Sequence, residues 1–333
     1  MYHVSRIKMA KIPDKNISVE DFTEETFQLE SLRDGEALCK TRFISLDPYL
    51  AEMMQSWQGP EPEWREGIIV GRMVGEIIES RDPRLEPGDW VNGDSHWQSL
   101  ESGPAKRFRK LQIEPGVPMS AYLGVLGASG LTAWIGVNRI IDVKEGETFT
   151  VSSAAGTVGA IAGQLAKMRG AKVVGVAGGQ DKCREVVSIL GFDACVDHLA
   201  PDFEAQLAAA VDGCIDAHYE NVGTKILDPV LGLMRDKGRI GLCGLIAHYL
   251  NDDAIELKNF RKLLTSGLTL QGFRIYDHLD AAKQAQVELM AGIRAGKITV
   301  RETITEGLPN APQAYVNMLG SGGIGKHVVH LTD

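Results

Sequence analysis

The sequence predicts an α/β protein with two domains: a barrel-like β domain and a doubly wound parallel sheet. Its 333 residues exceed the roughly 100–200 residues of a typical single domain. Residues 1–120 contain short apolar runs with strand periodicity, separated by turns such as Asp47-Pro48 and Asp82-Pro83, which is typical of antiparallel hairpins. From about residue 121, apolar strand candidates alternate with helical stretches, which is typical of a parallel sheet covered by helices.

The expected elements follow this order along the chain. Residues 37–46 and 68–79 are the clearest strands of the first part. The second part is predicted to contain strands at 148–152, 172–177, 194–196, 214–219, 239–243 and 268–273, with helices at 158–169, 181–190, 203–211 and 225–234. The amphipathic stretch 279–294 predicts a packing helix. Residues 299–333 return to strand-like and turn-like sequence.

Composition and charge argue against several classes of protein. The net charge is −9, from 35 Lys and Arg against 44 Asp and Glu. No basic block offsets this charge, so a nucleic-acid partner is not expected. The N-terminus lacks the uninterrupted apolar segment of a signal peptide. The longest uncharged stretch, 148–166, contains polar residues and three glycines, which is more typical of a buried strand, turn and helix than of a membrane span.

The five cysteines indicate a reducing compartment. Cys39, Cys183, Cys195, Cys214 and Cys243 are widely spaced and include no C-x-x-C pair. Disulfide frameworks and zinc sites use paired, closely spaced cysteines. We therefore expect reduced thiols in a cytoplasmic protein.

The strand expected at 148–152 runs into a turn that suits a phosphate group. The turn reads Ser153-Ala154-Ala155-Gly156-Thr157-Val158-Gly159 and leads into a helix. Backbone N–H groups at such a turn, together with the helix dipole, bind pyrophosphate. Gly156 would allow close approach of the ligand, and Gly159 would allow the helix to pack on the strand. Ser153 and Ala155 replace the first glycines of the G-x-G-x-x-G pattern, so a simple helix-start turn is the alternative. The repeated strand–helix alternation favours a nucleotide site.

The end of the next strand distinguishes the two nicotinamide dinucleotides. An NAD site usually places Asp or Glu there, about 20 residues after the glycines, to bind the ribose hydroxyls. Residues 176–180 read Val-Ala-Gly-Gly-Gln and contain no carboxylate. A carboxylate would repel a 2′-phosphate, whereas Lys182 follows as a cation. The sequence therefore favours NADP(H).

Several segments, in this order along nearly the whole chain, match a known family. They are Ser45-Leu46-Asp47-Pro48-Tyr49, Gly124-Val125-Leu126-Gly127, Gly130-Leu131-Thr132-Ala133-Trp134, Ala154-Ala155-Gly156-Thr157-Val158-Gly159, Gly191-Phe192-Asp193-Ala194, Glu220-Asn221-Val222-Gly223, Cys243-Gly244-Leu245-Ile246 and Asn310-Ala311-Pro312. Together they resemble the zinc-independent medium-chain dehydrogenase/reductases, in the group of prostaglandin, alkenal double-bond and NADPH-dependent curcumin reductases. The resemblance implies a GroES-like β-barrel domain from residues 1–121 and 295–333, a Rossmann domain from residues 122–294, NADPH as cofactor, and a homodimer.

The zinc-dependent branch of this superfamily can be compared directly. Its first cysteine ligand would fall around residues 45–47, where no cysteine occurs. Its Gly-His-Glu motif aligns with Gly71-Arg72-Met73, which supplies no zinc ligand. No metal site is expected.

The resemblance also implies which residues would hold the cofactor. Along the dinucleotide these are Gly156, Thr157, Val158 and Gly159 at the pyrophosphate, Lys182 and His198 at the 2′-phosphate, Asn221 at the ribose or nicotinamide, Cys243, Gly244, Leu245, Ile246 and Tyr249 along the wall, and Phe273, Arg274 and Ile275 beside the nicotinamide. Two positions depart from the family. His198 replaces the usual Tyr, and an exposed strand-end histidine is its alternative interpretation. Gly323 replaces the usual Asn, which removes a side-chain contact.

The activity implied by the resemblance is reduction of a carbon–carbon double bond conjugated to a carbonyl, in an α,β-unsaturated aldehyde or ketone. Hydride from NADPH reaches the β-carbon, and the enolate oxygen then needs a hydrogen-bond donor. Tyr249 is the first candidate, because the family has a substrate-site Tyr there and its hydroxyl donates without carrying charge. Tyr49 is the second candidate. Simple packing is the alternative for both, and Asp47 is expected to anchor its turn.

Two other functions stay open. A quinone oxidoreductase is the nearest enzymatic rival on the same fold. An NADPH-binding sensor or crystallin-like protein without turnover is the second, because Ala51, Ala128 and Gly323 change positions of the expected site.

Overall fold

The computed structural model describes residues 2–14, 16–56, 62–249, 254–320 and 323–332. The chain divides into two compact units: Met1–Leu123 with Glu302–Asp333, and Gly124–Arg301. The sequence placed these divisions after residues 121 and 294 instead. The segment 295–301 stays with the second unit because the Thr299 amide donates to Gln164 Oε1 (2.7 Å) and Arg301 pairs with Glu185.

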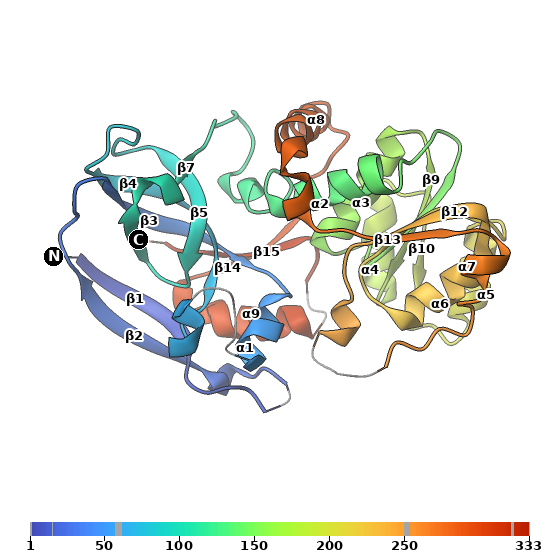
Figure 1. Ribbon diagram of the computed structural model, residues 1–333, viewed down its shortest axis with the longest axis horizontal. Coiled ribbons are helices and arrows are strands. Elements are labelled where there is room, and N and C mark those ends of the chain that lie inside the picture. The colour runs from blue at the N-terminus through green and yellow to red at the C-terminus, as the bar shows by residue number, and fades with distance from the viewer. Residues whose placement is uncertain (1, 15, 57–61, 250–253, 321–322, 333) are drawn as a thin grey trace. The chain divides into compact units, whose positions relative to one another are not determined.

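The first unit is built mainly from antiparallel strands. β1 (Tyr2–Met9) pairs with β2 (Phe22–Leu29). The main sheet has the order β14-β15-β3-β4-β5-β7, and β6 also pairs with β3. Its strands are β3 (Glu36–Leu46), β4 (Val70–Ser80), β5 (Trp90–His96), β6 (Leu100–Pro104), β7 (Arg109–Lys110), β14 (Glu302–Glu306) and β15 (Lys326–His330). β15, the last strand of the chain, pairs with β3, so segments from the first and last parts of the sequence share this sheet (Figure 1).

Among its described residues, the first unit has two α-helices, α1 (Leu50–Ser56) and α9 (Ala311–Leu319). The prediction of only strands and turns after residue 299 is therefore wrong for α9. Pro312 lies in the first turn of α9, where its missing N–H breaks no helical hydrogen bond. Ala311, Ala314 and Tyr315 are buried with helical spacing. Small residues dominate this face, so its helical period is weak in the sequence.

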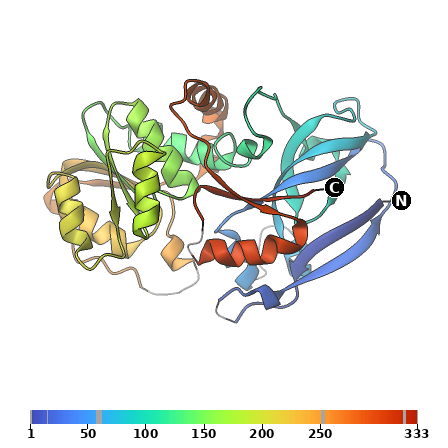
Figure 2. The same cartoon turned by 180° about the vertical axis from the view of Figure 1, so that it is seen from behind.

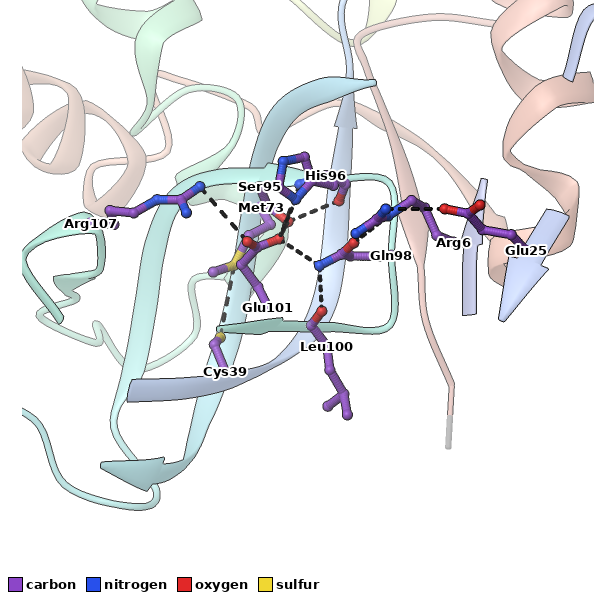
Figure 3. Close-up of polar contacts among 10 residues, drawn as sticks. All are labelled: Arg6, Glu25, Cys39, Met73, Ser95, His96, Gln98, Leu100, Glu101 and Arg107. Atoms are coloured by element: carbon purple, nitrogen blue, oxygen red, sulfur yellow. Dashed lines mark hydrogen bonds and ion pairs between the residues drawn. The ribbon is translucent and has the colours of Figure 1, made fainter. Parts of the chain in front are cut away.

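A buried carboxylate connects several strands of the first unit (Figure 3). Glu101 is 2% exposed and accepts hydrogen bonds from Gln98 Nε2 (2.9 Å) and Ser95 Oγ (3.2 Å). The backbone N–H of His96 also donates to it (3.2 Å), and His96 Nδ1 lies 3.1 Å from the same oxygen. Gln98 Oε1 in turn accepts from Arg6 Nε (2.7 Å), which extends the cluster to β1.

Glu101→Gln should destabilise the protein and weaken its acid sensitivity. Burial alone raises the pKa of Glu101, but the hydrogen bonds from His96 and the charge of Arg107 outweigh burial, so the pKa lies below its usual value. Such a carboxylate stabilises the fold above its unfolded pKa and loses this contribution as the pH falls through its folded pKa. We expect the variant to lose about 1–3 kcal/mol at neutral pH, measured by urea unfolding, and to lose less than the wild type on acidification.

The matched control for Glu101→Gln is Glu24→Gln, at an exposed position of β2. The control should keep both the urea midpoint and the acid profile of the wild type. Superimposable acid profiles for the wild type and Glu101→Gln would contradict the assigned role of the buried carboxylate.

The second unit is a parallel sheet of six strands in the order β10-β9-β8-β11-β12-β13. Its strands are β8 (Thr148–Ser152), β9 (Lys172–Ala177), β10 (Ala194–Asp197), β11 (Ile215–Glu220), β12 (Met234–Leu242) and β13 (Thr269–Gly272). Its α-helices are α2 (Ala128–Ile135), α3 (Thr157–Met168), α4 (Gln180–Ser188), α5 (Phe203–Ala210), α6 (Thr224–Leu233), α7 (Lys262–Thr265) and α8 (Ala282–Arg294). The predicted α/β class is confirmed. Within the described ranges, no helix is long and apolar enough to span a bilayer.

Helices cover both faces of this sheet, and several stand in front of the strands in Figure 2. On one face, Val174 and Val196 pack with Phe203 of α5. The alternate residues of the strands face α4, because a Cβ atom built on Gly175 would lie 3.1 Å from Val186 Cγ1. The predicted strands 148–152 and 172–177 match β8 and β9 in both bounds. The other strands and helices predicted for this part are present with shifted ends.

Candidate functional site

The residues expected to hold a dinucleotide gather at one edge of the second unit's sheet. Residues 156–159 follow β8, Lys182 and His198 follow β9 and β10, Asn221 follows β11, residues 243–249 follow β12, and residues 273–275 follow β13. Because all six strands are parallel, their carboxyl ends share this edge. Open α/β sheets bind ligands in the crevice outside these ends.

The turn between β8 and α3 has the geometry of a phosphate cradle. Ser153 adopts a positive φ of 51°, and the Gly156 amide donates to the Ser153 carbonyl at 2.9 Å. A Cβ atom on Gly159 would lie 2.2 Å from the same carbonyl, so only glycine allows the helix to approach the strand this closely. Gly156 is the N-cap of α3 and supplies no side-chain cap. The positive end of the helix dipole therefore faces outward at the turn, as an anion site requires.

The end of β9 lies beside the His198 ring and carries no carboxylate of its own. Residues 176–180 carry none, and the His198 ring lies beside the backbone there, with Nε2 3.0 Å from a Cβ atom built on Gly178. The neighbouring Asp197 turns its Oδ1 to the backbone amides of Gly179 (2.8 Å) and Leu199 (2.9 Å). These hydrogen bonds lower the pKa of Asp197. The Asp197 carboxylate beside this strand end thus serves the backbone.

Two lysines act electrostatically on His198. Lys182 lies in the first turn of α4, and Lys225 lies in the first turn of α6. Burial and the charges of Lys225 and Lys182 lower the pKa of His198, against the opposite influence of Asp197. Burial also lowers the pKa of Lys182. His198 is therefore neutral at neutral pH, and its buried Nδ1 has no hydrogen-bond partner among the described residues. This neighbourhood suits an anion held by cations and a neutral imidazole.

A fully buried carboxylate, Glu220, holds the loop after β11. Its Oε1 accepts hydrogen bonds from the Gly223 amide (2.8 Å) and from Ser152 Oγ at the end of β8 (2.9 Å). Its Oε2 lies 2.7 Å from His218 Nε2. Asn221 Nδ2 donates to the Ser152 carbonyl (2.8 Å). The amide nitrogen of Asn221 therefore ties this loop to the strand that precedes the phosphate turn.

The loop after β12 places the Tyr249 side chain beside the backbone of Gly244 in the same loop. The Ile246 amide donates to the Asn221 carbonyl at 3.1 Å, so this loop runs beside the loop after β11. The Tyr249 hydroxyl lies 2.9 Å from a Cβ atom built on Gly244. The absence of a side chain at Gly244 leaves the space that this hydroxyl needs.

His248 fastens the same loop to α6. Its ring lies against Gly223, and its Nε2 accepts from the Thr224 amide at 3.4 Å. The N-cap of α6 is Gly223, which provides no side-chain cap, so His248 serves one of the first amides of the helix.

The segment after β13 contains Phe273, whose ring packs on an aromatic neighbour, and Arg274, whose guanidinium is ion-paired. Phe273 makes an edge-to-face contact with Tyr219, with ring centroids 6.2 Å apart. Arg274 Nη2 pairs with Asp277 Oδ1 at 3.0 Å. The Arg274 side chain is therefore paired within its own segment, and the contact of its backbone with the nicotinamide stays a prediction.

Tyr49 and Gly323 lie in the first unit. Tyr49 follows the turn at Asp47 and is 37% exposed. Lys326 Nζ donates to Asp47 Oδ1 at 2.5 Å, and Tyr315 donates to the Asp47 carbonyl at 3.3 Å. Asp47 thus anchors the turn before Tyr49, as predicted. Gly323 has a positive φ of 76°, a conformation that both glycine and asparagine adopt.

Comparisons with known proteins identify the family. A family model described as zinc-binding dehydrogenase matches residues 157–291, and one described as the N-terminal domain of oxidoreductase matches residues 5–111. The NADPH-dependent curcumin reductase of Escherichia coli (strain K12) is 40% identical over 326 residues, which cover 94% of this chain and 92% of the relative. The chain belongs to the medium-chain dehydrogenase/reductase family.

Other members of the medium-chain dehydrogenase/reductase family agree with this assignment. The NADP(+)-dependent 2-alkenal reductase of Nicotiana tabacum is 35% identical over 299 residues, covering 89% of this chain and 87% of the relative. The crystal structure of CurA from Vibrio vulnificus in complex with NADPH has a TM-score of 0.91 at 34% identity, with 99% of both chains covered. An Escherichia coli quinone oxidoreductase, with a TM-score of 0.78 at 19% identity, shares the fold. The predicted resemblance and the predicted fold are confirmed.

Because one matching family model is described as zinc-binding dehydrogenase, the positions of the zinc ligands in that branch are of interest in this chain. Ser45 donates to Asp47 Oδ2 at 2.6 Å, and the charge of Arg72 acts on the same carboxylate. A catalytic zinc needs about three His, Cys or carboxylate ligands. In the part of the chain that the structure describes, no three such residues are grouped to hold a metal.

Three residues of the second unit, Lys225, Glu220 and His248, make contacts that were not predicted from the sequence. Lys225 carried a signal, because a cation in the first turn of a helix opposes the helix dipole. Glu220 also carried one, since a charged residue ends an apolar strand. The position of His248 depends on the path of its loop, and no local sequence pattern predicts that His248 contacts α6.

Proposed function

We propose that this chain is an NADPH-dependent reductase of carbon–carbon double bonds conjugated to a carbonyl, acting on 2-alkenals and enones. Two relatives support this, named as an NADPH-dependent curcumin reductase and a 2-alkenal reductase. The observation that carries the proposal is the Tyr249 hydroxyl beside Gly244. It lies on a loop at the same sheet edge as the phosphate turn, where a bound dinucleotide would meet it.

The residues of the second unit fit NADPH. The Gly156 N-cap and the close approach at Gly159 leave the α3 amides for the pyrophosphate. Lys182 would pair with the 2′-phosphate, and Lys225 would add positive potential. His198 would donate one hydrogen bond as a neutral imidazole. Asp197 is directed to the backbone, so its repulsion of the 2′-phosphate is reduced.

The main catalytic task of the chain in this reaction is to stabilise the negative charge that develops on the carbonyl oxygen. A bound NADPH supplies a hydride to the β-carbon of the substrate, which leaves negative charge on the carbonyl oxygen. Tyr249 would donate a hydrogen bond to that oxygen without introducing a charge. Such a donor is worth ~3–4 kcal/mol when it meets the developing charge. Tyr49, exposed on the first unit, is the second candidate for this hydroxyl.

A panel of electron acceptors tests the proposed activity. The protein should oxidise NADPH with a trans-2-alkenal and with an enone at rates above those with a quinone. Turnover of the quinone alone would favour a quinone oxidoreductase, whose fold this chain shares. Tight NADPH binding without turnover of any acceptor would favour a sensor or crystallin-like role.

Lys182→Ala should separate the two nicotinamide dinucleotides. Because Lys182 would contact only the extra phosphate, we expect the KM for NADPH to rise about tenfold to a hundredfold, the effect of one lost charge-assisted contact. The KM for NADH should stay within about twofold. Steady-state kinetics with each cofactor measure the split.

Lys297→Ala is the control for Lys182→Ala, because Lys297 is exposed in the same unit. It should leave both KM values unchanged. An equal rise for NADPH and NADH in Lys182→Ala would assign Lys182 to the fold rather than to the phosphate.

We further propose a cytoplasmic homodimer that interacts with neither nucleic acid nor membrane. The five free cysteines support a reducing compartment. The end strand β13 and its neighbourhood support a second copy as partner, because Phe260 (59%), Leu264 (84%) and Tyr276 (68%) are exposed there. Sedimentation velocity measures this oligomeric state.

A further inference from the structure

Cys183 and Cys195 face each other between α4 and β10. Val196 packs toward α5, so the preceding Cys195 points to the opposite face of the sheet, which α4 covers. Cys195 also pairs in register with Gly175, whose missing side chain would point at Val186 of α4. Cys183 lies one helical turn before Val186. Helix and strand thus direct the two thiols to the same place.

The side chains of Cys183 and Cys195 are hydrogen-bonded to each other, and both thiols are free. Cys183 is buried, whereas Cys195 is partly exposed. The hydrogen bond from Cys195 outweighs burial and lowers the pKa of Cys183, and the same contact raises the pKa of Cys195. One sulfur therefore ionises more readily than an ordinary thiol while its neighbour keeps a proton. This is the arrangement of a reactive thiol beside a resolving thiol.

The pair lies beside the proposed 2′-phosphate site. Cys183 directly follows Lys182 in the first turn of α4. Cys195 precedes His198 on the segment that ends β10. Cys183 is adjacent to Lys182, and Cys195 lies three positions before His198, so a bond between the sulfurs would link the two segments that lead to the phosphate site.

We propose that Cys183 and Cys195 form an oxidisable dithiol, in which a peroxide closes a disulfide and weakens the binding of NADPH. The effect on NADPH rests on the proposed cofactor site, whereas the disulfide itself does not. A disulfide holds its sulfurs at ~2.05 Å and its Cβ atoms at ~3.5–4.5 Å. Closing it draws the first turn of α4 toward β10 and shifts the Lys182 side chain away from the 2′-phosphate.

The chemistry balances with hydrogen peroxide as the oxidant. The Cys183 thiolate attacks one peroxide oxygen, the O–O bond breaks, and hydroxide leaves with Cys183 as a sulfenic acid. The Cys195 sulfur then attacks the sulfenic sulfur, the S–S bond forms, and the S–O bond breaks. One hydroxide takes up the proton of the Cys195 thiol, and the other takes up the proton that Cys183 released when it ionised. Two thiols and one peroxide therefore give one disulfide and two waters.

The test uses the full chain, first reduced and then treated with a small excess of hydrogen peroxide. Non-reducing digestion with a protease that does not cleave at Lys or Arg, followed by mass spectrometry, should find Cys183 linked to Cys195. Titrations of nucleotide fluorescence, without any acceptor, should show the Kd for NADPH rising about tenfold, as for one lost charge-assisted contact. The Kd for NADH should stay unchanged, and a thiol reductant should restore the Kd for NADPH.

Variants and opposite outcomes complete the test. Peroxide-treated Cys195→Ser and Cys195→Ala should keep the NADPH affinity of the reduced protein. Cys214→Ser, which removes a thiol outside the pair, should respond as the wild type does. Full alkylation of both cysteines after peroxide would overturn the dithiol, and a linked pair with unchanged NADPH affinity would overturn its control of binding. Neither result depends on turnover, so failure of the proposed reductase activity would be seen separately.

Discussion

Tyr249→Phe should lower kcat for an enal or enone by roughly tenfold to a thousandfold, the range for loss of one donor to a developing oxyanion. The variant removes one oxygen atom and keeps the ring. The hydroxyl lies beside the backbone of Gly244, and urea unfolding of the variant should give the wild-type midpoint if the fold tolerates the change. The KM for NADPH should change little, because the proposed partner of the hydroxyl is the substrate. Single-turnover kinetics measure the chemical step directly.

Two further variants sharpen this expectation. Tyr2→Phe removes a tyrosine hydroxyl that donates to Glu79 in the first unit, and it should leave kcat unchanged. Gly244→Ala would place a methyl group 2.9 Å from the Tyr249 hydroxyl, so it should reduce kcat by displacing that hydroxyl. A Tyr249→Phe variant with the wild-type rate of the chemical step would transfer the role to another donor, with Tyr49 next to be tested.

The parts of the fold that were predictable are those whose burial is continuous. β8 and β9 lie inside the sheet, so both of their faces are apolar and their bounds stand out in the sequence. β12 begins earlier than expected, at Met234, because exposed residues such as Asp236 and Lys237 belong to it. α9 was missed because its buried face includes small residues, whose hydrophobic period is faint. Local pattern therefore marks interior elements better than surface ones.

The residues of the candidate site also fall into those that a local sequence pattern predicts and those that depend on distant contacts. The phosphate turn and Lys182 were predicted because a short segment contains the whole signal. The surroundings of His198 could not be predicted, because Lys225 approaches it from a different element. The anchoring of Asp47 likewise needs Lys326, which lies 279 positions further along the chain. Such contacts arise from sheet pairing between distant strands, so a single local pattern does not contain them.

Lys326→Met should destabilise the protein by about 3 kcal/mol, because it leaves a buried carboxylate without its main counter-charge. Lys326 is 2% exposed, and its Nζ donates to Asp47 Oδ1 (2.5 Å) and to the Leu46 carbonyl (3.0 Å). Burial alone raises the pKa of Asp47, but the charges of Lys326 and Arg72 and the hydrogen bonds of Lys326 and Ser45 outweigh it, so the pKa lies below its usual value. In the variant, burial still raises the pKa of Asp47, but only Arg72 and Ser45 remain to oppose it. The pKa of Asp47 should therefore rise. Urea unfolding at neutral pH measures the loss.

The pH dependence and a second substitution separate charge from packing. In the wild type, the stabilising effect of the Asp47 carboxylate is present above its unfolded pKa and is lost as the pH falls through its folded pKa. In Lys326→Met, a raised pKa lets Asp47 take up a proton earlier, so the deficit relative to the wild type should shrink on acidification. The double variant Asp47→Asn/Lys326→Met has no uncompensated charge at this position and should regain stability over Lys326→Met at neutral pH. If the double variant is instead less stable than Lys326→Met, the ion pair does not explain the loss, and the packing of the Lys326 side chain between β15 and β3 does.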